Sequence, residues 1–360
     1  MNIKSSLNIG KISGINVKLH WSFSLLILWI FTSSLRSGGS IGDGIHQILF
    51  VFAIFGCVVL HELGHALTAR KFGYETKQIV LSPIGGMAQM KQLPQKPLEE
   101  LLVAIAGPLV SFALAMFFYV AFGVFGSEVI SQETHSLDKV LDSNFLFNLF
   151  VINLILAIFN LIPAFPMDGG RIFRAALSMK LTRASATKIA ANVGQIIAII
   201  FIIVGVKHNP FLVLIGIFIF MAARTEETYE RSRSILSDFK VKNLIMTKYT
   251  VFDHNDHIDK VVAVILASQE KEFVVVHNQE VVGVLTQNNV IQALSLKENF
   301  CLHEIMNKKF PSFSPNMNLK SAYEVLVTNQ YSVGPVIENS KLVGILNMEN
   351  IQEFLLFNKI

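Results

Sequence analysis

The sequence contains few cysteines and few charged side chains. Cys57 and Cys301 are the only two cysteines in 360 residues, so no disulfide framework is expected. Charged residues make up 16% of the chain, and the net charge of +4 comes from scattered lysines and arginines rather than from a basic stripe. This distribution offers nucleic acid no electrostatic surface, and we expect no nucleic-acid partner.

Hydrophobic residues, in contrast, make up 52% of the chain and gather in long runs. This composition is typical of a membrane protein with an attached soluble part, and the lipid bilayer is an expected partner. The first run is followed by no small-residue cleavage site, so we interpret it as a span and not as a signal peptide. The candidate transmembrane helices are residues 19–35, 48–72, 101–125, 145–165, 189–206 and 211–223.

The lysines and arginines outside these runs predict an orientation. Thirteen of them lie in residues 1–19, 70–100 and 166–190, whereas the alternate loops hold only Arg36, Lys139 and Lys207. Because positively charged loops stay in the cytoplasm, both termini should be cytoplasmic. We expect a multi-pass protein of the plasma membrane.

The second apolar run leads directly into His61-Glu62-Leu63-Gly64-His65. In one continuous helix, positions i and i+4 stack, so both imidazoles could reach one cation while Glu62, about 100° around the helix, stays free to act on water. The alternative is a chance match to a short motif. Ionisable groups beside an apolar run persist mainly where they face a cavity or a partner, which favours the metal site. The pattern is typical of a zinc peptidase.

The fourth run ends in residues 160–171, Asn-Leu-Ile-Pro-Ala-Phe-Pro-Met-Asp-Gly-Gly-Arg. Its two prolines should stop the helix near the membrane face where His61 and His65 also lie. Asp168 could then be a third ligand, leaving the fourth position of a tetrahedral zinc site for water. Alternatively, Asp168 caps a following helix at residues 169–176. Spacing alone does not decide between these two roles.

Residues 77–95 are too polar to span a membrane. Short strands over residues 79–81 and 86–90 are predicted on either side of a turn at residues 82–85, which gives a β hairpin directly after the second helix. Residues 10–23 alternate weakly between apolar and polar.

A charged stretch at residues 224–233, which should begin as helix, separates the apolar part from an internal repeat. Ile-Met-Thr-Lys at 245–248 recurs as Ile-Met-Asn-Lys at 305–308, and Val-Gly-Val-Leu at 282–285 recurs as Val-Gly-Ile-Leu at 343–346. The predicted organisation is a transmembrane domain, a charged linker and two α/β repeats, with limits 1–223, 224–240, 241–300 and 301–360. The nearby pair His254 and His257 is not expected to bind metal, because polar residues are usual in such a loop.

HELGHALTA at 61–69 and NLIPAFPMDGGR at 160–171 resemble the signatures of the site-2 protease family of intramembrane zinc metalloproteases. The whole chain is similar to the subgroup with a C-terminal pair of CBS domains. The resemblance implies one Zn²⁺ per chain on His61, His65 and Asp168, with Glu62 as general base.

The same resemblance implies that Asn160 contacts the substrate or its oxyanion, and that the hairpin around Gly86 and Met87 receives the substrate as an added strand. The implied fold is a polytopic α-helical membrane protein with about six transmembrane helices and a small membrane-associated β hairpin, followed by a cytoplasmic α/β tandem CBS domain. The implied substrates are membrane-spanning proteins, cut within or near their transmembrane segments in regulated intramembrane proteolysis.

CBS pairs often bind adenine nucleotides or set the oligomeric state. A homodimer that forms through this pair is therefore one expectation. The acidic residue that commonly holds ribose is replaced by Asn289 and Asn350, which argues against an adenine nucleotide. Two alternatives are a CBS-gated transporter and a catalytically silent scaffold. The apolar runs lack the internal repeat of many transporters, and the intact metal motif argues against a silent scaffold.

Overall fold

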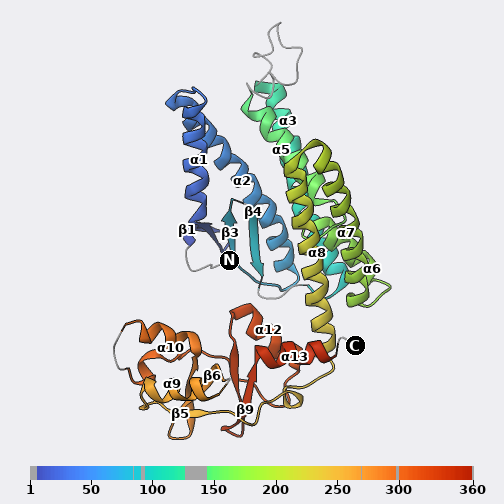
Figure 1. Cartoon of the computed structure of the whole chain (residues 1–360). Helices are drawn as coiled ribbons and strands as arrows, with labels where there is room; N and C mark the ends of the chain where they lie inside the picture. Colours follow the sequence, from blue (N-terminus) through green and yellow to red (C-terminus); the bar gives the residue numbers. More distant parts are fainter. Residues whose placement is uncertain are drawn as a thin grey trace. The chain divides into compact units, whose positions relative to one another are not determined.

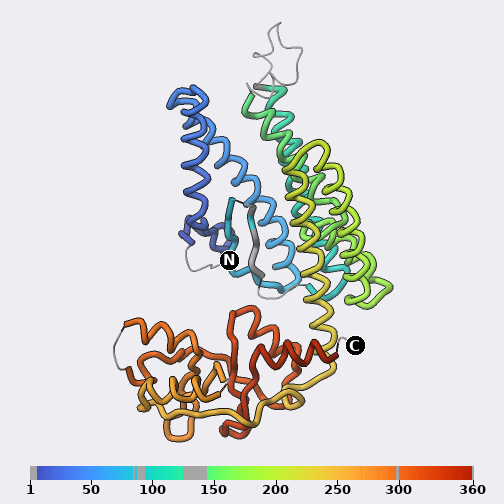
Figure 2. The backbone as a smooth tube through the Cα atoms, viewed as in Figure 1, coloured from blue at the N-terminus to red at the C-terminus, as the bar shows by residue number. Residues whose placement is uncertain are grey.

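The computed structural model describes residues 6–83, 85–90, 94–125, 144–268, 270–296 and 300–358. These residues form two compact units, residues 1–227 and 228–360, which are described separately. The boundary lies inside helix α8 (Pro210–Leu236), which Figure 1 shows as one continuous helix. Residues 224–233 are therefore helical, as predicted. Figure 2 follows the backbone through both units.

The first unit is mainly helical. Its helices are α1 (Ser22–Arg36), α2 (Ile41–Lys71), α3 (Pro97–Phe125), α5 (Phe145–Asn160), α6 (Asp168–Ser178), α7 (Arg183–His208) and the first part of α8. Among the described residues, α2, α3 and α7 are long and apolar enough to cross a membrane, and α1 and α5 are shorter apolar helices. The other three of the six spans remain predictions. Lys139 and Ile84, used in the orientation and turn arguments, lie outside the described residues.

Helix α2 begins seven residues before the predicted apolar run, and its capping explains why. The Ser40 hydroxyl accepts a hydrogen bond from the Asp43 N–H, and the Asp43 carboxylate accepts one from the Ser40 N–H, which satisfies two free donors at the helix start. Helix α3 contacts α2, α5 and α6 and continues through Pro108 without a break. The two helices α2 and α3 approach closely at Gly64, where an added Cβ would lie 2.9 Å from the Ala106 carbonyl oxygen.

A four-stranded sheet packs against α2 (Figure 1). Its strands, in spatial order, are β1 (Ser6–Ile12), β2 (Ile15–His20), β3 (Thr76–Ser82) and β4 (Gly85–Met90). Strands β3 and β4 pair antiparallel where a hairpin was predicted, and β2 pairs with β3 in parallel. The sheet is larger than that hairpin because the weakly alternating N-terminal residues supply two more strands. Within the described residues β4 is an edge strand.

The second unit contains two similar halves. The first half contains β5 (Val251–Asp253), α9 (Ile258–Ala267), β6 (Glu272–His277), β7 (Glu280–Thr286), α10 (Gln287–Leu294) and α11 (Leu302–Ile305). The second contains α12 (Leu319–Asn329), β8 (Val333–Glu338), β9 (Lys341–Asn347) and α13 (Met348–Phe357), and a 3₁₀ turn (Val241–Asn243) precedes both. Strand–turn–strand–helix order therefore occurs twice, in agreement with the sequence repeat.

The two halves exchange segments. Met246, in the first copy of the repeated tetrapeptide, pairs with Ile345 of β9, and Asn307, in the second copy, pairs with Val284 of β7. Consistently, Val241 lies in the core of the second half and Leu302 lies in the core of the first. The repeats interlock and form one compact unit, while their predicted sequence limits remain a prediction.

Candidate metal centre

Three side chains from two distant segments converge in the first unit. His61 and His65, one turn apart on α2, and Asp168, the first residue of α6, are all buried. Asp168 Oδ2 lies 3.2 Å from His61 Nε2 and 3.1 Å from His65 Nε2, and the two Nε2 atoms are 3.2 Å apart. We call these three residues the buried cluster. The three residues predicted as metal ligands thus lie together as one group that could hold a metal ion.

The second nitrogen of each imidazole is held by α3. His61 Nδ1 lies 2.8 Å from Ser111 Oγ, and His65 Nδ1 lies 2.7 Å from the Val103 carbonyl oxygen. Because a carbonyl oxygen only accepts, His65 Nδ1 carries the proton, and in the neutral ring Nε2 then presents its lone pair to the cluster. Metal-binding histidines are typically oriented by such a partner on the outer nitrogen.

The size of the buried cluster fits a small cation. Zinc binds nitrogen and oxygen at about 2.0–2.1 Å in tetrahedral geometry, which separates neighbouring ligand atoms by about 3.3 Å. The observed separations of 3.1–3.2 Å are close to that value. Gly107 of α3 leaves the adjacent space open, since an added Cβ would lie 2.1 Å from His65 Nε2 and 2.7 Å from His61 Nε2. The donor set and the space therefore both suit a zinc ion.

Asp168 does not cap a helix at residues 169–176. The helix begins at Asp168 itself, and the capping position is Met167, whose side chain makes no capping hydrogen bond. The Asp168 carboxylate instead faces the two imidazoles. The two glycines that follow allow the preceding loop to pack against the helix start, because an added Cβ at Gly169 would lie 2.2 Å from the Ile162 carbonyl oxygen and one at Gly170 would lie 2.7 Å from the Ala164 carbonyl carbon.

The other predicted site residues lie outside the buried cluster. Glu62 is half-buried on α2, and β4 passes beside it: an added Cβ at Gly86 would lie 3.1 Å from Glu62 Cγ. Met87 continues the same strand and pairs with Val80 of β3. Asn160 is the half-buried last residue of α5. In the described part of the chain, no hydrogen bond joins Asn160 to the buried cluster.

Three supporting features on α3 were missed by the sequence analysis: Ser111, the Val103 carbonyl and Gly107. A polar residue and a small residue in an apolar run are weak signals of a helix contact or a site. A contact to a backbone carbonyl, such as that of Val103, leaves no signal in the sequence, because every residue has a carbonyl.

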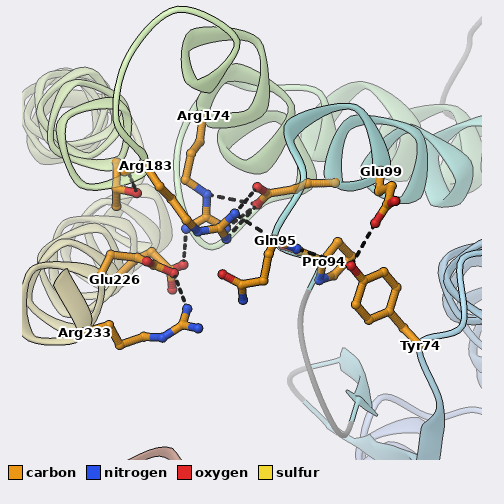
Figure 3. Close-up of polar contacts among 11 residues, drawn as sticks. Tyr74, Pro94, Gln95, Glu99, Arg174, Arg183, Glu226 and Arg233 are labelled. Atoms are coloured by element: carbon orange, nitrogen blue, oxygen red, sulfur yellow. Dashed lines mark hydrogen bonds and ion pairs between the residues drawn. The ribbon is translucent and has the colours of Figure 1, made fainter. Parts of the chain in front are cut away.

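A buried ion network holds α6, and thus Asp168, against the other helices. Arg174 of α6 is 1% exposed; its Nε donates to Glu100 of α3 at 2.9 Å, and its Nη1 donates to Glu226 of α8. Arg183 of α7 also donates to Glu100, at 2.6 Å. Figure 3 shows Arg174 and Arg183 turned toward the same group of carboxylates. The Arg174 guanidinium also lies 5.0 Å from the ring of Phe165, in the loop before Asp168.

Comparison with known proteins identifies the family. The family model of peptidase family M50 matches residues 49–204, which include His61, Glu62, His65 and Asp168. The model of the CBS domain matches residues 302–356. A zinc metalloprotease of Methanocaldococcus jannaschii is 32% identical over 348 residues, covering 96% of this chain and 95% of that protein. The chain belongs to peptidase family M50. The predicted resemblance to site-2 proteases with a C-terminal CBS domain is thereby confirmed.

Other similar proteins cover less of the chain. The solved structure of the site-2 protease from Methanocaldococcus jannaschii has 39% identity and covers 62% of this chain and 95% of that one, with a TM-score of 0.45. The stage IV sporulation protein FB of Bacillus subtilis is 30% identical over 152 residues, which are 38% of this chain and 48% of that protein. M50 membership and the three apolar helices together support a membrane metalloprotease.

Proposed function

We propose that this protein is an intramembrane zinc metalloprotease that hydrolyses peptide bonds within or near the transmembrane segments of membrane-tethered proteins. The observation that carries the proposal is the convergence of His61, His65 and Asp168 in a buried cluster at the end of an apolar helix. Its zinc-metalloprotease relative, which matches nearly the whole chain, supports zinc as the metal.

A zinc ion held by these three ligands would supply Lewis acidity to a peptide carbonyl and would make water a stronger nucleophile at neutral pH. Glu62, next to His61 on α2, would accept the proton from the attacking water and pass it to the leaving amine. Ser111 and the Val103 carbonyl would keep both imidazoles oriented throughout the reaction. Asn160 is proposed to contact the substrate or to donate a hydrogen bond to the developing oxyanion.

Strand β4 is proposed to receive the substrate. A helical peptide bond is already hydrogen-bonded and sterically enclosed, so the substrate must unwind, and an edge strand can replace the lost hydrogen bonds. Two observations support β4 in this role: it is the edge of the described sheet, and its Gly86 lies beside Glu62. A substrate paired along Gly86 and Met87 would therefore extend past the proposed general base.

The proposed setting is the plasma membrane, with six spans, both termini in the cytoplasm and the β3–β4 hairpin associated with the membrane. The distribution of lysine and arginine supports this orientation. Because α1 and α5 are apolar but shorter than 18 residues, each would need a locally thin bilayer or flanking polar residues at the interface.

The CBS pair is proposed to modulate access to the site, through dimerisation or through a ligand of modest affinity. A cavity of about 580 Å³ opens between the repeats, lined by four glutamates (Glu270, Glu272, Glu349 and Glu353) and by only two lysines (Lys248 and Lys271). This excess of acidic side chains disfavours the binding of a nucleoside triphosphate, because its phosphates are negatively charged. Asn289 is already used in the capping of α10 with Thr286, which supports the argument against ribose binding. Such coupling would typically change the rate about 5-fold to 150-fold.

The central test compares wild type with Glu62→Gln and Asp168→Ala in proteoliposomes that contain a single-span substrate. We expect Glu62→Gln to retain one zinc per chain and to lose cleavage, because Glu62 moves protons and does not bind the metal. Asp168→Ala should lose zinc and cleavage together. Full cleavage by Glu62→Gln would refute the proposed mechanism, and full zinc content in Asp168→Ala would refute the proposed ligand set. Single-span precursors that accumulate in membranes of the Glu62→Gln strain would identify substrates.

The docking strand is tested by proline at two consecutive positions, Met87→Pro and Ala88→Pro. Consecutive N–H groups of a strand point to opposite edges, so one variant removes an outward donor and the other a bond to β3, and each serves as the control for the other. We expect unchanged zinc content and a loss of turnover in the variant that lacks the outward donor. Equal wild-type turnover in both variants would contradict substrate pairing on β4.

A further inference from the structure

A second cluster of side chains that could bind a metal occurs in the second unit, residues 228–360, which we call the CBS unit. It is far from the buried cluster in sequence. Asp253, His254 and His277 each offer one ligand atom, and these atoms all lie within 4.8 Å of one another. His254 Nδ1 is 3.1 Å from Asp253 Oδ1, and the ring centroids of His254 and His277 are 3.9 Å apart. We call these three residues the strand-end cluster.

The backbone holds the strand-end cluster in place. Asp253 ends β5 and His277 ends β6, two adjacent parallel strands in which Asp253 is in register with Val276. The His254 N–H donates to the Val276 carbonyl oxygen at 2.9 Å, which fixes the residue after β5 against the end of β6. The positions of both histidines are therefore set by sheet pairing, not by a free loop.

Helix α11 borders the same place and brings one more histidine. The His303 N–H donates to the His254 carbonyl oxygen at 3.1 Å, and the two imidazole centroids are 6.0 Å apart. His303 Nδ1 lies 3.3 Å from the same carbonyl oxygen, so His303 would join as a fourth ligand only after its side chain rotates away from that contact. In contrast, His257 lies outside the cluster, with its Nδ1 3.9 Å from Cys301 Sγ.

We propose that the strand-end cluster is a second metal site, which binds a divalent transition metal through Asp253, His254 and His277, with His303 as an additional ligand. Imidazole and carboxylate ligands suit Zn²⁺, Ni²⁺ or Cu²⁺, whereas Mg²⁺ and Ca²⁺ prefer oxygen ligands alone. The side chains of His254 and Asp253 are 22% and 52% exposed, so the ion exchanges directly with solvent and binds more weakly than at the buried cluster.

The bound ion joins β5, β6 and α11, three elements of the same half of the CBS unit. Because it binds the folded form, it stabilises this half in proportion to the logarithm of its concentration over its dissociation constant. The CBS unit thereby responds to the available metal, independently of catalysis at the buried cluster.

The test uses the full-length protein without an affinity tag. Weakly bound metal is removed with a chelator, and Co²⁺ is then titrated while its visible absorption is recorded. Wild type is expected to bind one equivalent of Co²⁺ in addition to the metal retained at the buried cluster. His254→Ala and His277→Ala should bind this equivalent at least about tenfold more weakly. His257→Ala, a histidine in the same loop that lies outside the cluster, is the matched control and should titrate as wild type.

Thermal unfolding of the metal-free variants checks that each is folded. If an alanine variant is unfolded, Asp253→Asn and His277→Gln replace it, since both preserve side-chain size and are exposed. Absence of a second equivalent in wild type would overturn the proposal, as would a wild-type titration in the folded His254 and His277 variants. Neither result would affect the proposed catalytic metal, which is assayed by the zinc content of Asp168→Ala.

Discussion

The two units carry clusters of the same composition, two histidines and one aspartate, in opposite surroundings. In the buried cluster all three side chains are enclosed, and α3 supplies a hydrogen-bond partner to each outer nitrogen. In the strand-end cluster Asp253 and His277 are exposed, backbone pairing positions the residues, and Asn278 Nδ2 lies 3.3 Å from His277 Nε2. Both clusters have a composition that suits a metal, while burial, oriented imidazoles and the neighbouring Glu62 set the proposed catalytic centre apart from the proposed binding site.

The largest expected effect comes from removing the space beside the buried cluster. Gly107→Ala places a Cβ where the structure puts His65 Nε2 2.1 Å away, so the imidazoles must move from their ligand positions. We expect zinc affinity and cleavage to fall by about 100-fold or more, because displaced imidazoles should cost at least as much as the loss of an outer partner of a ligand. The loss of affinity is measured as the zinc content after dialysis, and the loss of activity as the cleavage rate.

Gly123→Ala is the matched control for that change. Gly123 lies on the same helix, α3, and an added Cβ there meets nothing within 4 Å. It should retain wild-type zinc and wild-type cleavage. Normal zinc content in Gly107→Ala would show that the space beside the imidazoles does not belong to the metal site.

Asp168→Asn should have the next largest effect. The amide keeps the size of the side chain and its place at the start of α6, but it removes the negative charge that faces two imidazoles. We expect zinc affinity to fall about 10-fold to 100-fold with an unchanged helix content. The corresponding change in the other cluster, Asp253→Asn, should weaken only the second metal. Loss of the same metal in both variants would show that the two clusters are not independent.

The sequence predicted the grouping of the buried cluster but not that of the strand-end cluster, for a physical reason. His61 and His65 are one helical turn apart, so local periodicity brings them together, and Asp168 lies in a motif of its own. His277 joins His254 only because β5 and β6 pair in parallel across an intervening helix, which local periodicity does not encode. The same limit applies to the parallel pairing of β2 with β3 across α1 and α2. The β1–β2 pair is a local hairpin around Ser13 and Gly14, and the weak alternation of residues 10–23 did not reveal it.

Ser111→Ala tests the buried side-chain support of the buried cluster. It removes the partner of His61 Nδ1, 2.8 Å away, and leaves every ligand atom in place. We expect about a tenfold loss of zinc affinity, the smaller end of the range for such partners. Competition with a zinc chelator measures it, and Ser111→Thr, which retains a hydroxyl, should recover most of the affinity. Equal affinity in wild type and Ser111→Ala would mean that packing alone orients His61.

The smallest expected effect is on stability, and it follows from comparing one carboxylate in each unit, the buried Asp168 and the half-buried Glu272. Asp168 faces two imidazoles, whereas Glu272 of β6 faces the neutral amide of Asn347, whose Nδ2 donates to it at 3.1 Å. Burial raises the pKa of the Glu272 carboxyl above its ordinary value, against hydrogen bonds from Asn347 and Ser332 that lower it. With a raised folded pKa, the favourable contribution of Glu272 is complete below its unfolded pKa, about 4.3, and is lost as the pH rises through the folded pKa.

Glu272→Gln should therefore stabilise the CBS unit slightly at pH 7.5, because it removes a charge that folding disfavours and keeps an acceptor for Asn347. Near pH 3, well below the unfolded pKa, the advantage should vanish, since wild-type Glu272 is then protonated in both states. Thermal unfolding at the two pH values measures the difference, and Glu280→Gln, an exposed glutamate on β7, is the control. A stabilisation that is equal at both pH values would show that the charge of Glu272 is not its cause.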